Sequence, residues 1–219
     1  FNRRPVKVWR KLMSYIDGQL FKFKKLIEAS IINGGAKGKE SMIRSSVLIN
    51  LIHDAVKNSL IEAGISPANV IPNLGSTKPE LKLAGFFKQK NQDVCIIPSN
   101  VQQVPTLINW GAMAFENKKD KYGYEYSTNT LVINIRSQMS SLAKNTDTLF
   151  ERTIAEAQNL HMRYPNIVLG EVYLIPTHEY DDDLVKRNIV GFKKKHINIE
   201  KYISFFNSIN NRNCLLYTS

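Results

Sequence analysis

The stretch TLVINIRSQMSSLAKNTDTLFERTIAEAQNLHMRYPNIVLGEVYLI, residues 130–175, decides the fold class of this chain. Its first part, Thr130 to Ile135, is an apolar run rich in β-branched residues, which is the composition of a buried strand. A polar loop follows, and apolar residues then recur with helical spacing from Phe150 to Tyr164. A second apolar run, Val168 to Ile175, closes the stretch. Strand, helix and strand in this order predict a β-α-β unit, and therefore an α/β fold.

The region before this unit has two parts with different residue patterns. Apolar residues recur with helical spacing from Val8 to Ala63, apart from a glycine-rich break at residues 33–39 that we interpret as a linker. From Pro67 to Pro105, short apolar runs alternate with turn residues, which is typical of strands. We therefore expect a helical N-terminal region over residues 1–64 and an α/β core over residues 65–213, with helices before and after the sheet.

The composition indicates a soluble protein with a polyanionic partner. Lysine and arginine number 30 against 19 aspartate and glutamate residues, a formal net charge of +11, and 43% of the residues are hydrophobic. This composition excludes a disordered chain, and the positive charge favours binding to nucleic-acid phosphates. No apolar run approaches the ~18 residues that a membrane-spanning helix needs. Cys95 and Cys214 alone cannot build a disulfide framework, so we expect a cytoplasmic location and no membrane partner.

The two ends of the sequence indicate a fragment. The chain begins at Phe1 rather than at a methionine. Its last segment, CLLYTS at residues 214–219, reads like one translated frame of a sequencing adapter. We therefore treat residues 214–219 as an artefact outside the fold, and expect the natural protein to extend beyond the sequence given.

Polar residues suited to catalysis stand at the ends of the predicted strands. Asp93 begins an apolar run after a basic, polar stretch at residues 88–92, and carboxylate oxygens in such a setting bind hard divalent cations. The alternative role of Asp93 is to cap the turn before the strand. Asn134 and Arg136 stand two residues apart on a later strand, so their side chains point to the same face of the sheet. Glu151 follows near the predicted first turn of the helix.

Two segments carry a family resemblance. One is RSQMSSLAKNTDTLFERTIAEAQNL, from Arg136 to Leu160, and the other is GFFKQKNQDVCII, from Gly85 to Ile97. The first resembles the KSQ-containing strand, loop and helix of type II restriction endonucleases of the XhoI kind, in the PD-(D/E)XK nuclease superfamily. The second resembles the segment that carries the metal-binding aspartate of those enzymes. Taken on to Ile175, the resemblance covers about a quarter of the chain and implies a restriction-endonuclease-like core, a mixed sheet flanked by helices.

The resemblance also assigns roles by position. It implies that Asp93 is the metal-binding aspartate and that Gln138 is the glutamine that often follows the motif. Asn134 stands where the family has its second carboxylate, and Arg136 stands where it has lysine. Arginine keeps its proton near neutral pH, so Arg136 stabilises negative charge but cannot act as a base. Asn134 offers only a neutral carbonyl, so another acid must share the metal ion.

Glu151 is the acid that we expect to replace the missing carboxylate, because some enzymes of this superfamily supply it from the helix after the strand. A metal site of Asp93 and Glu151 would then hold Mg²⁺. The alternative is that Glu151 forms a capping box with Thr148, whose spacing fits that motif equally well. Glu80 and Glu156 are reserve acids. The histidines show no HxxxH or HExxH spacing, so we expect no zinc site.

The function that the resemblance implies is that of a type II restriction enzyme. Such an enzyme hydrolyses phosphodiester bonds of double-stranded DNA at a specific sequence, with Mg²⁺ as cofactor, and acts as a homodimer. The expected catalytic residues are Asp93, Asn134, Arg136 and Glu151. The expected DNA-binding residues are Gln138, Lys88, Lys90 and Lys144. Two alternatives stay open, a DNA-binding protein that keeps the nuclease fold without the chemistry, and a structure-specific or repair nuclease.

Overall fold

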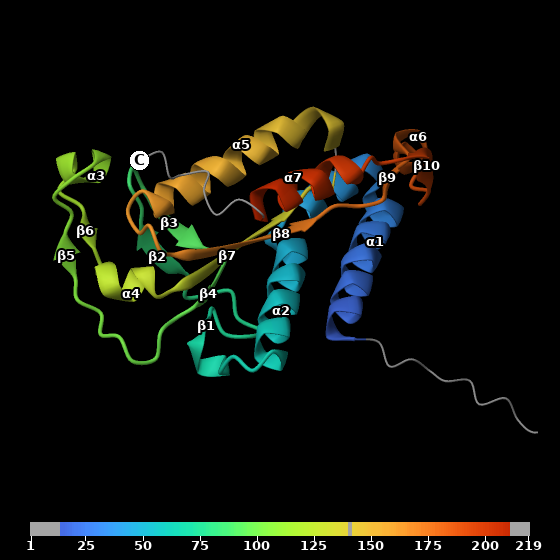
Figure 1. Ribbon diagram of the computed structural model, residues 1–219. Helices are drawn as coiled ribbons and strands as arrows, with labels where there is room; N and C mark the ends of the chain where they lie inside the picture. The colour runs from blue at the N-terminus through green and yellow to red at the C-terminus, as the bar shows by residue number, and fades with distance from the viewer. Residues whose placement is uncertain (1–13, 140–141, 211–219) are drawn as a thin grey trace, which may run out of the picture.

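A computed structural model describes residues 14–139 and 142–210, without the side chains of residues 142–144 and 210. Within these residues the chain forms a four-stranded sheet with helices on both faces and three two-stranded sheets around it (Figure 1). The predicted DNA-binding side chain of Lys144 and the segment 214–219 lie outside the described part.

The four-stranded sheet contains the predicted β-α-β unit. Its strand order is β1-β4-β7-β8, with bounds Val70–Ile71, Val94–Ile96, Leu131–Ser137 and Val168–Leu174. Strands β1, β4 and β7 are antiparallel neighbours, whereas β7 and β8 are parallel and joined through helix α5, Leu142–His161. A parallel pair needs such a crossover, because a tight turn can only reverse the chain. The predicted α/β class, with a mixed sheet flanked by helices, is confirmed.

The N-terminal region is helical, as predicted. It consists of α1, Tyr15–Arg44, and α2, Ser46–Glu62. The predicted linker at residues 33–39 is reduced to a kink at Gly35, φ 54° and ψ −135°, where two helical stretches of α1 meet. Gly35 packs against the end of helix α6, Asp182–Lys186, where an added Cβ would lie 3.1 Å from the Val185 carbonyl oxygen. The positive φ and this close approach both favour glycine at the kink.

Hydrophobic side chains fill both faces of the sheet. On one face, Ile133 and Ile135 of β7 pack with buried residues of α1 and α2, such as Ile27. On the other face, Val132 packs with the C-terminal end of α5. Because successive side chains of a strand point to opposite faces, the even-numbered residues of β7 point to the α5 face. The predicted pair on β7 therefore lies between the sheet and α5.

The remaining elements surround this core. Strands β2 and β3 form one hairpin, and β5 and β6 pair within an excursion that also contains α3 and α4. After β8, the chain forms β9, α6 and β10 in this order, and β9 and β10 pair with each other. Helix α7 ends the described chain. None of the described helices has both the length and the apolar composition to cross a membrane. The bounds of these elements are β2 Leu81–Ala84, β3 Gln89–Gln92, β5 Thr106–Leu107, α3 Ala112–Phe115, β6 Lys119–Asp120, α4 Tyr124–Thr128, β9 His178–Tyr180, β10 Phe192–His196, α7 Glu200–Asn210 and the short 3₁₀ helix Pro67–Asn69.

Candidate active site

A row of polar residues lies on and beside two neighbouring strands. Asn134 of β7 is the register partner of Glu171 of β8, and its Nδ2 donates a hydrogen bond of 2.7 Å to Glu171 Oε1. On the other side of β7, Val94 of β4 is the partner of Ile133, and Asp93 stands in the bend directly before β4. Side chains at paired positions share a face of the sheet, so Asn134 and Glu171 lie on the same face. Asp93 adjoins β7 from the other side, at the backbone of Ile135.

Asp93 is fixed to the strand that carries the rest of the motif. Its Oδ2 accepts a hydrogen bond of 2.8 Å from the backbone N–H of Ile135, which lies between Asn134 and Arg136. This hydrogen bond runs to the neighbouring strand rather than to the turn that Asp93 was alternatively expected to cap. His53 of α2 lies close by. Burial lowers the pKa of His53, and the charge of Asp93 acts in the opposite direction.

Arg136 is held by acids from two other elements. Its Nη2 forms an ion pair with Glu156 of α5, and its Nε lies 3.9 Å from Glu171 Oε2. The same Glu156 oxygen lies 2.6 Å from Nζ of Lys90 on β3. Burial alone would lower the pKa of Arg136, but Tyr173 and the two acids outweigh it and raise the pKa. Arg136 therefore remains a cation, as its chemistry predicts.

The two glutamates of this cluster have pKa values displaced in opposite directions. Burial raises the pKa of Glu171 to about 7, although the hydrogen bond from Asn134 and the charge of Arg136 oppose this. Burial also acts to raise the pKa of Glu156, but Lys90 and Arg136 together lower it. Near neutral pH, Glu156 is therefore ionised, whereas Glu171 is present in both its protonated and its ionised form. Neighbouring acids with separated pKa values are a common feature of catalytic sites.

Three atoms of the cluster are buried without a hydrogen-bond partner. They are Oδ1 of Asn134, Nε of Arg136 and Oε2 of Glu171. Native proteins rarely leave such atoms unpaired, because each costs about 1–3 kcal/mol. Arg136 Nε and Glu171 Oε2 face each other at 3.9 Å as an ion pair too long for a hydrogen bond, so Asn134 Oδ1 is the atom of the three that has no partner of either kind.

The predicted metal pair of Asp93 and Glu151 does not follow from the observed helix. Because α5 begins at Leu142, Glu151 lies well inside it, so neither a first-turn position nor a capping box with Thr148 is available. Glu151 is exposed, and five residues separate it from Glu156, so the two side chains leave α5 on different faces.

The oxygen atoms of the row fit a hard cation better. Among the described residues, no cluster of three or more histidine, cysteine or acidic side chains is arranged to hold a metal ion. However, Mg²⁺ typically takes one or two carboxylates and completes its shell with water and phosphate oxygens. Glu171 and the unpaired Oδ1 of Asn134 are oxygen donors of this kind, and Asp93 is the carboxylate that adjoins β7 from the other side.

The predicted DNA-binding residues lie near this cluster. Lys90 belongs to it through Glu156, whereas Lys88 is exposed on the turn between β2 and β3. The buried Asn159 of α5 holds that turn, because its Oδ1 accepts from the Phe87 and Lys88 N–H groups at 3.0 and 3.3 Å. Gln138 follows β7, and its backbone N–H donates to the Leu174 carbonyl at 3.0 Å.

Sequence reasoning missed Glu171 and underrated Glu156. Glu171 stands within the apolar run of β8, and a single acid inside a buried strand is the signal that could have identified it. Glu156 was only a reserve acid. The other reserve, Glu80, is occupied elsewhere, by Lys78 at 2.8 Å and Asn91 at 2.7 Å.

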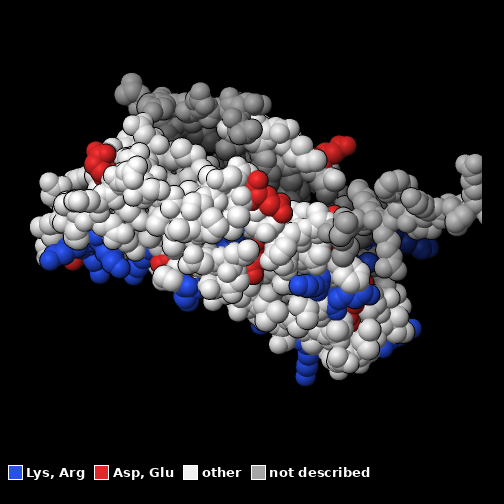
Figure 2. Space-filling model, turned by 90° about the horizontal axis from the view of Figure 1, so that it is seen from below, with Lys and Arg blue, Asp and Glu red and all other residues white. Residues whose placement is uncertain are grey.

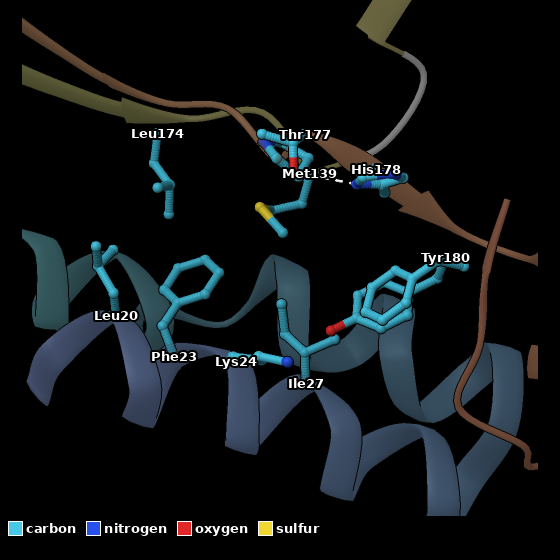
Figure 3. A pocket seen from close by; sticks show the side chains of 11 residues that line it. Leu20, Phe23, Lys24, Ile27, Met139, Leu174, Thr177, His178 and Tyr180 are labelled. Carbon is cyan, nitrogen blue, oxygen red and sulfur yellow. Dashed lines mark hydrogen bonds between the residues drawn. The ribbon is translucent and has the colours of Figure 1, made fainter. Parts of the chain in front are cut away.

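An apolar pocket of about 380 Å³ lies apart from this cluster (Figure 3). Phe23 and Ile27 of α1 form one wall, and Leu174 and Tyr180 lie on the opposite side. It contains none of the acids of the polar row. The chemistry of the candidate site therefore rests on the polar row alone.

No protein-family model, curated protein or solved structure matches this chain significantly.

Proposed function

We propose that this protein is a divalent-cation-dependent endonuclease of double-stranded DNA, in which Glu171 of β8 supplies the second carboxylate. The observation that carries the proposal is the hydrogen-bonded pair of Asn134 and Glu171 on β7 and β8, with Arg136 on the same face of β7 and Asp93 bonded to the Ile135 N–H from the bend before β4. The motif that the sequence resembles needs two acids and one cation near a scissile phosphate. The row supplies both acids, although the second stands one strand away from its expected place.

Each residue of the cluster has a distinct role in this proposal. Asp93, Glu171 and the Asn134 carbonyl would hold Mg²⁺, which when bound polarises phosphoryl oxygens and makes a nearby water more acidic. Arg136 binds the phosphate and stabilises the negative charge that develops as water attacks. Glu156 and Lys90 orient the guanidinium, since Glu156 contacts both of them.

Charge supports DNA as the substrate. The net charge of +11 favours a polyanion, and Lys88 and Lys90 lie on the hairpin beside the cluster. Palindromic recognition by a homodimer belongs to the same proposal, because the sequence resemblance implies it. Sequence-specific cutting would give discrete fragments, whereas a structure-specific nuclease would cut without regard to sequence.

A second candidate is a DNA-binding protein without nuclease activity. Its support is that Arg136 is paired with Glu156 and that the Asn134 amide donates to Glu171, so the cluster partly neutralises itself. Both candidates bind DNA in a salt-dependent way, so only cleavage separates them.

The test is plasmid cleavage in Mg²⁺ by the wild type and by three variants, Asp93→Asn, Glu171→Gln and Glu151→Gln. We expect the first two variants to lose about 100-fold or more in rate, since each removes a charge at the reacting phosphate. Glu151→Gln is the matched control, because Glu151 lies on α5 with its side chain exposed to solvent. Circular dichroism confirms that each variant is folded.

Three results decide between the candidates. DNA binding without cleavage by the wild type would favour the second candidate. Loss of cleavage in Glu151→Gln but not in Glu171→Gln would overturn the proposed acid pair. Discrete fragments that disappear only in Asp93→Asn and Glu171→Gln would support the proposal.

A further inference from the structure

The excursion between β4 and β7 presents large apolar side chains to solvent. We call residues 104–121, which contain β5, α3 and β6, the aromatic lobe. Phe115 is 93% exposed, and Leu107 and Trp110 are 60% and 45% exposed. Burying one such side chain is worth about 1.5–3 kcal/mol, so a surface that exposes several of them favours a partner that covers them.

The lobe is built to hold these side chains outward. Beneath them, Ile108 and Met113 form a small core with Ala84 of β2, so α3 is already packed on its inner side. Trp110 lies against Phe86, with ring centroids 5.4 Å apart. The outward position of Phe115 is therefore the result of a packed inner face.

A buried acid fixes the lobe to the core. Asp120 of β6 is fully buried, and its Oδ2 accepts a 2.6 Å hydrogen bond from the Tyr164 hydroxyl and lies 3.2 Å from Arg163 Nη2. Its Oδ1 accepts from the N–H groups of Tyr122 and Gly123, both at 3.1 Å. The lobe is thus a preorganised projection, which lowers the entropic cost of binding.

Lysines lie beside the apolar side chains, together with the exposed Glu116, whose Oε2 is 3.7 Å from Lys118 Nζ. Lys118, Lys119 and Lys121 are exposed on and beside β6, and Lys119 is the register partner of Leu107 on β5. Figure 2 shows basic side chains gathered along one edge of the molecule, at the end where α3, β5 and β6 lie in Figure 1. A second copy docking through the same patch would bring lysines against lysines, which disfavours self-association.

The lobe also connects to the candidate active site. Gln89 Nε2 of β3 donates to the Lys119 carbonyl of β6 at 2.8 Å, and the next residue, Lys90, contacts Glu156. We propose that the aromatic lobe is a DNA-docking surface, with its lysines on phosphates and Trp110 and Phe115 against bases. This inference rests on the proposed nuclease function and names the surface that holds the substrate for it.

Exposed aromatic side chains next to basic ones suit nucleic acid for a physical reason. Lysines supply affinity through release of counterions, and apolar side chains contact base edges or wedge between base steps. Neither contact requires a groove in the protein. The lobe is a projection rather than a cavity, which is the shape that enters a groove of DNA.

The test measures binding of a fluorescein-labelled DNA duplex by fluorescence anisotropy, with Ca²⁺ in place of Mg²⁺ to prevent cutting. We expect Phe115→Ala and Trp110→Ala to weaken binding about 10-fold each, which is the scale of one base contact. Ile203→Ala is the matched control, because Ile203 is 53% exposed on α7, away from the lobe. Replacing Lys118, Lys119 and Lys121 with alanine should reduce the slope of log K against log salt by about 2.7, about 0.9 for each lysine.

The outcomes separate this inference from the proposed function. Unchanged binding by the lobe variants, beside a wild type that cuts DNA, would overturn the inference and leave the nuclease intact. If the wild type binds the duplex but does not cut DNA, and the lobe variants lose this binding, the inference is supported and the nuclease proposal is overturned. A wild type that binds no duplex would overturn both. Analytical ultracentrifugation tests whether a second copy of the chain covers the lobe instead of DNA. A wild-type dimer that dissociates in Phe115→Ala but not in Ile203→Ala would overturn the inference.

Discussion

Asn134 and Glu171 are register partners on the parallel strands β7 and β8, and the amide of one donates to the carboxylate of the other at 2.7 Å. Neighbouring strands lie only about 4.8 Å apart, so a carboxylate on β8 reaches nearly the same space as one on β7. The asparagine that looks like a loss in the sequence therefore has an acid beside it in the fold.

The first prediction concerns stability and pH. The pKa of Glu171 is raised from its ordinary 4.5 to about 7, so its contribution to stability is present below about pH 4.5 and is lost as the pH rises through about 7. Glu171→Gln removes this pH-dependent loss of stability, because glutamine does not ionise. Relative to the wild type, the variant should gain up to about 3 kcal/mol in unfolding free energy between pH 5 and pH 8. Urea unfolding at both pH values measures it, and an equal difference at both would contradict the raised pKa.

The second prediction concerns the pH dependence of cleavage. Glu171 must be ionised to carry negative charge in the proposed site, and its pKa is about 7. We therefore expect kcat/KM for a defined duplex to rise with pH and to level off above neutrality. The rate is measured at limiting Mg²⁺, because a bound cation lowers the pKa of its carboxylate ligand. A rate that stays constant from acidic to neutral pH under this condition would show that ionisation of Glu171 does not limit the reaction.

The third prediction concerns the anchor of the aromatic lobe. Asp120→Asn leaves Arg163, which is 8% exposed, without its ion pair, and such a loss typically costs about 3–5 kcal/mol. Thermal and urea unfolding should both show the destabilisation. Asp147→Asn is the control, because Asp147 is 85% exposed in its pair with Lys201 and should change stability by less than about 1 kcal/mol.

The fourth prediction concerns the turn that carries Lys88. An added Cβ at Gly85 would overlap the side-chain amide of Asn159, which is buried and hydrogen-bonded to that turn. Gly85→Ala should therefore cost about 1–3 kcal/mol. In Asn159→Ala the obstacle is absent, so the second substitution should add little in the double variant. A double-mutant cycle checks this, and strictly additive costs would contradict the contact.

The elements with strong periodicity were predictable from the sequence. The β-branched run of β7, the apolar run of β8 and the helical spacing of α5 gave the parallel unit, because each pattern reflects burial of one face. The shared face of Asn134 and Arg136 followed from the alternation of side chains along a strand. Asp93 was also placed correctly at the head of a strand.

The parts that depend on contacts distant in sequence were not predictable. The strand β3, Gln89–Gln92, is polar, and it is defined by its pairing with β2 rather than by its own composition. Helix α5 begins at Leu142, before the apolar periodicity starts. A prediction from the periodicity therefore placed the helix start too late and Glu151 in the first turn. The meeting of Glu171 with Asn134 depends on the register of two strands that lie far apart along the chain, and no local pattern encodes it.

The bond from the Ile135 peptide N–H to Asp93 has a consequence for substitutions. Its donor belongs to the main chain, so every residue type except proline at position 135 retains it. The position of the Asp93 carboxylate is thus fixed by the backbone of the sheet. Substitutions of the side chain at position 135 therefore leave the donor of this hydrogen bond in place, proline excepted.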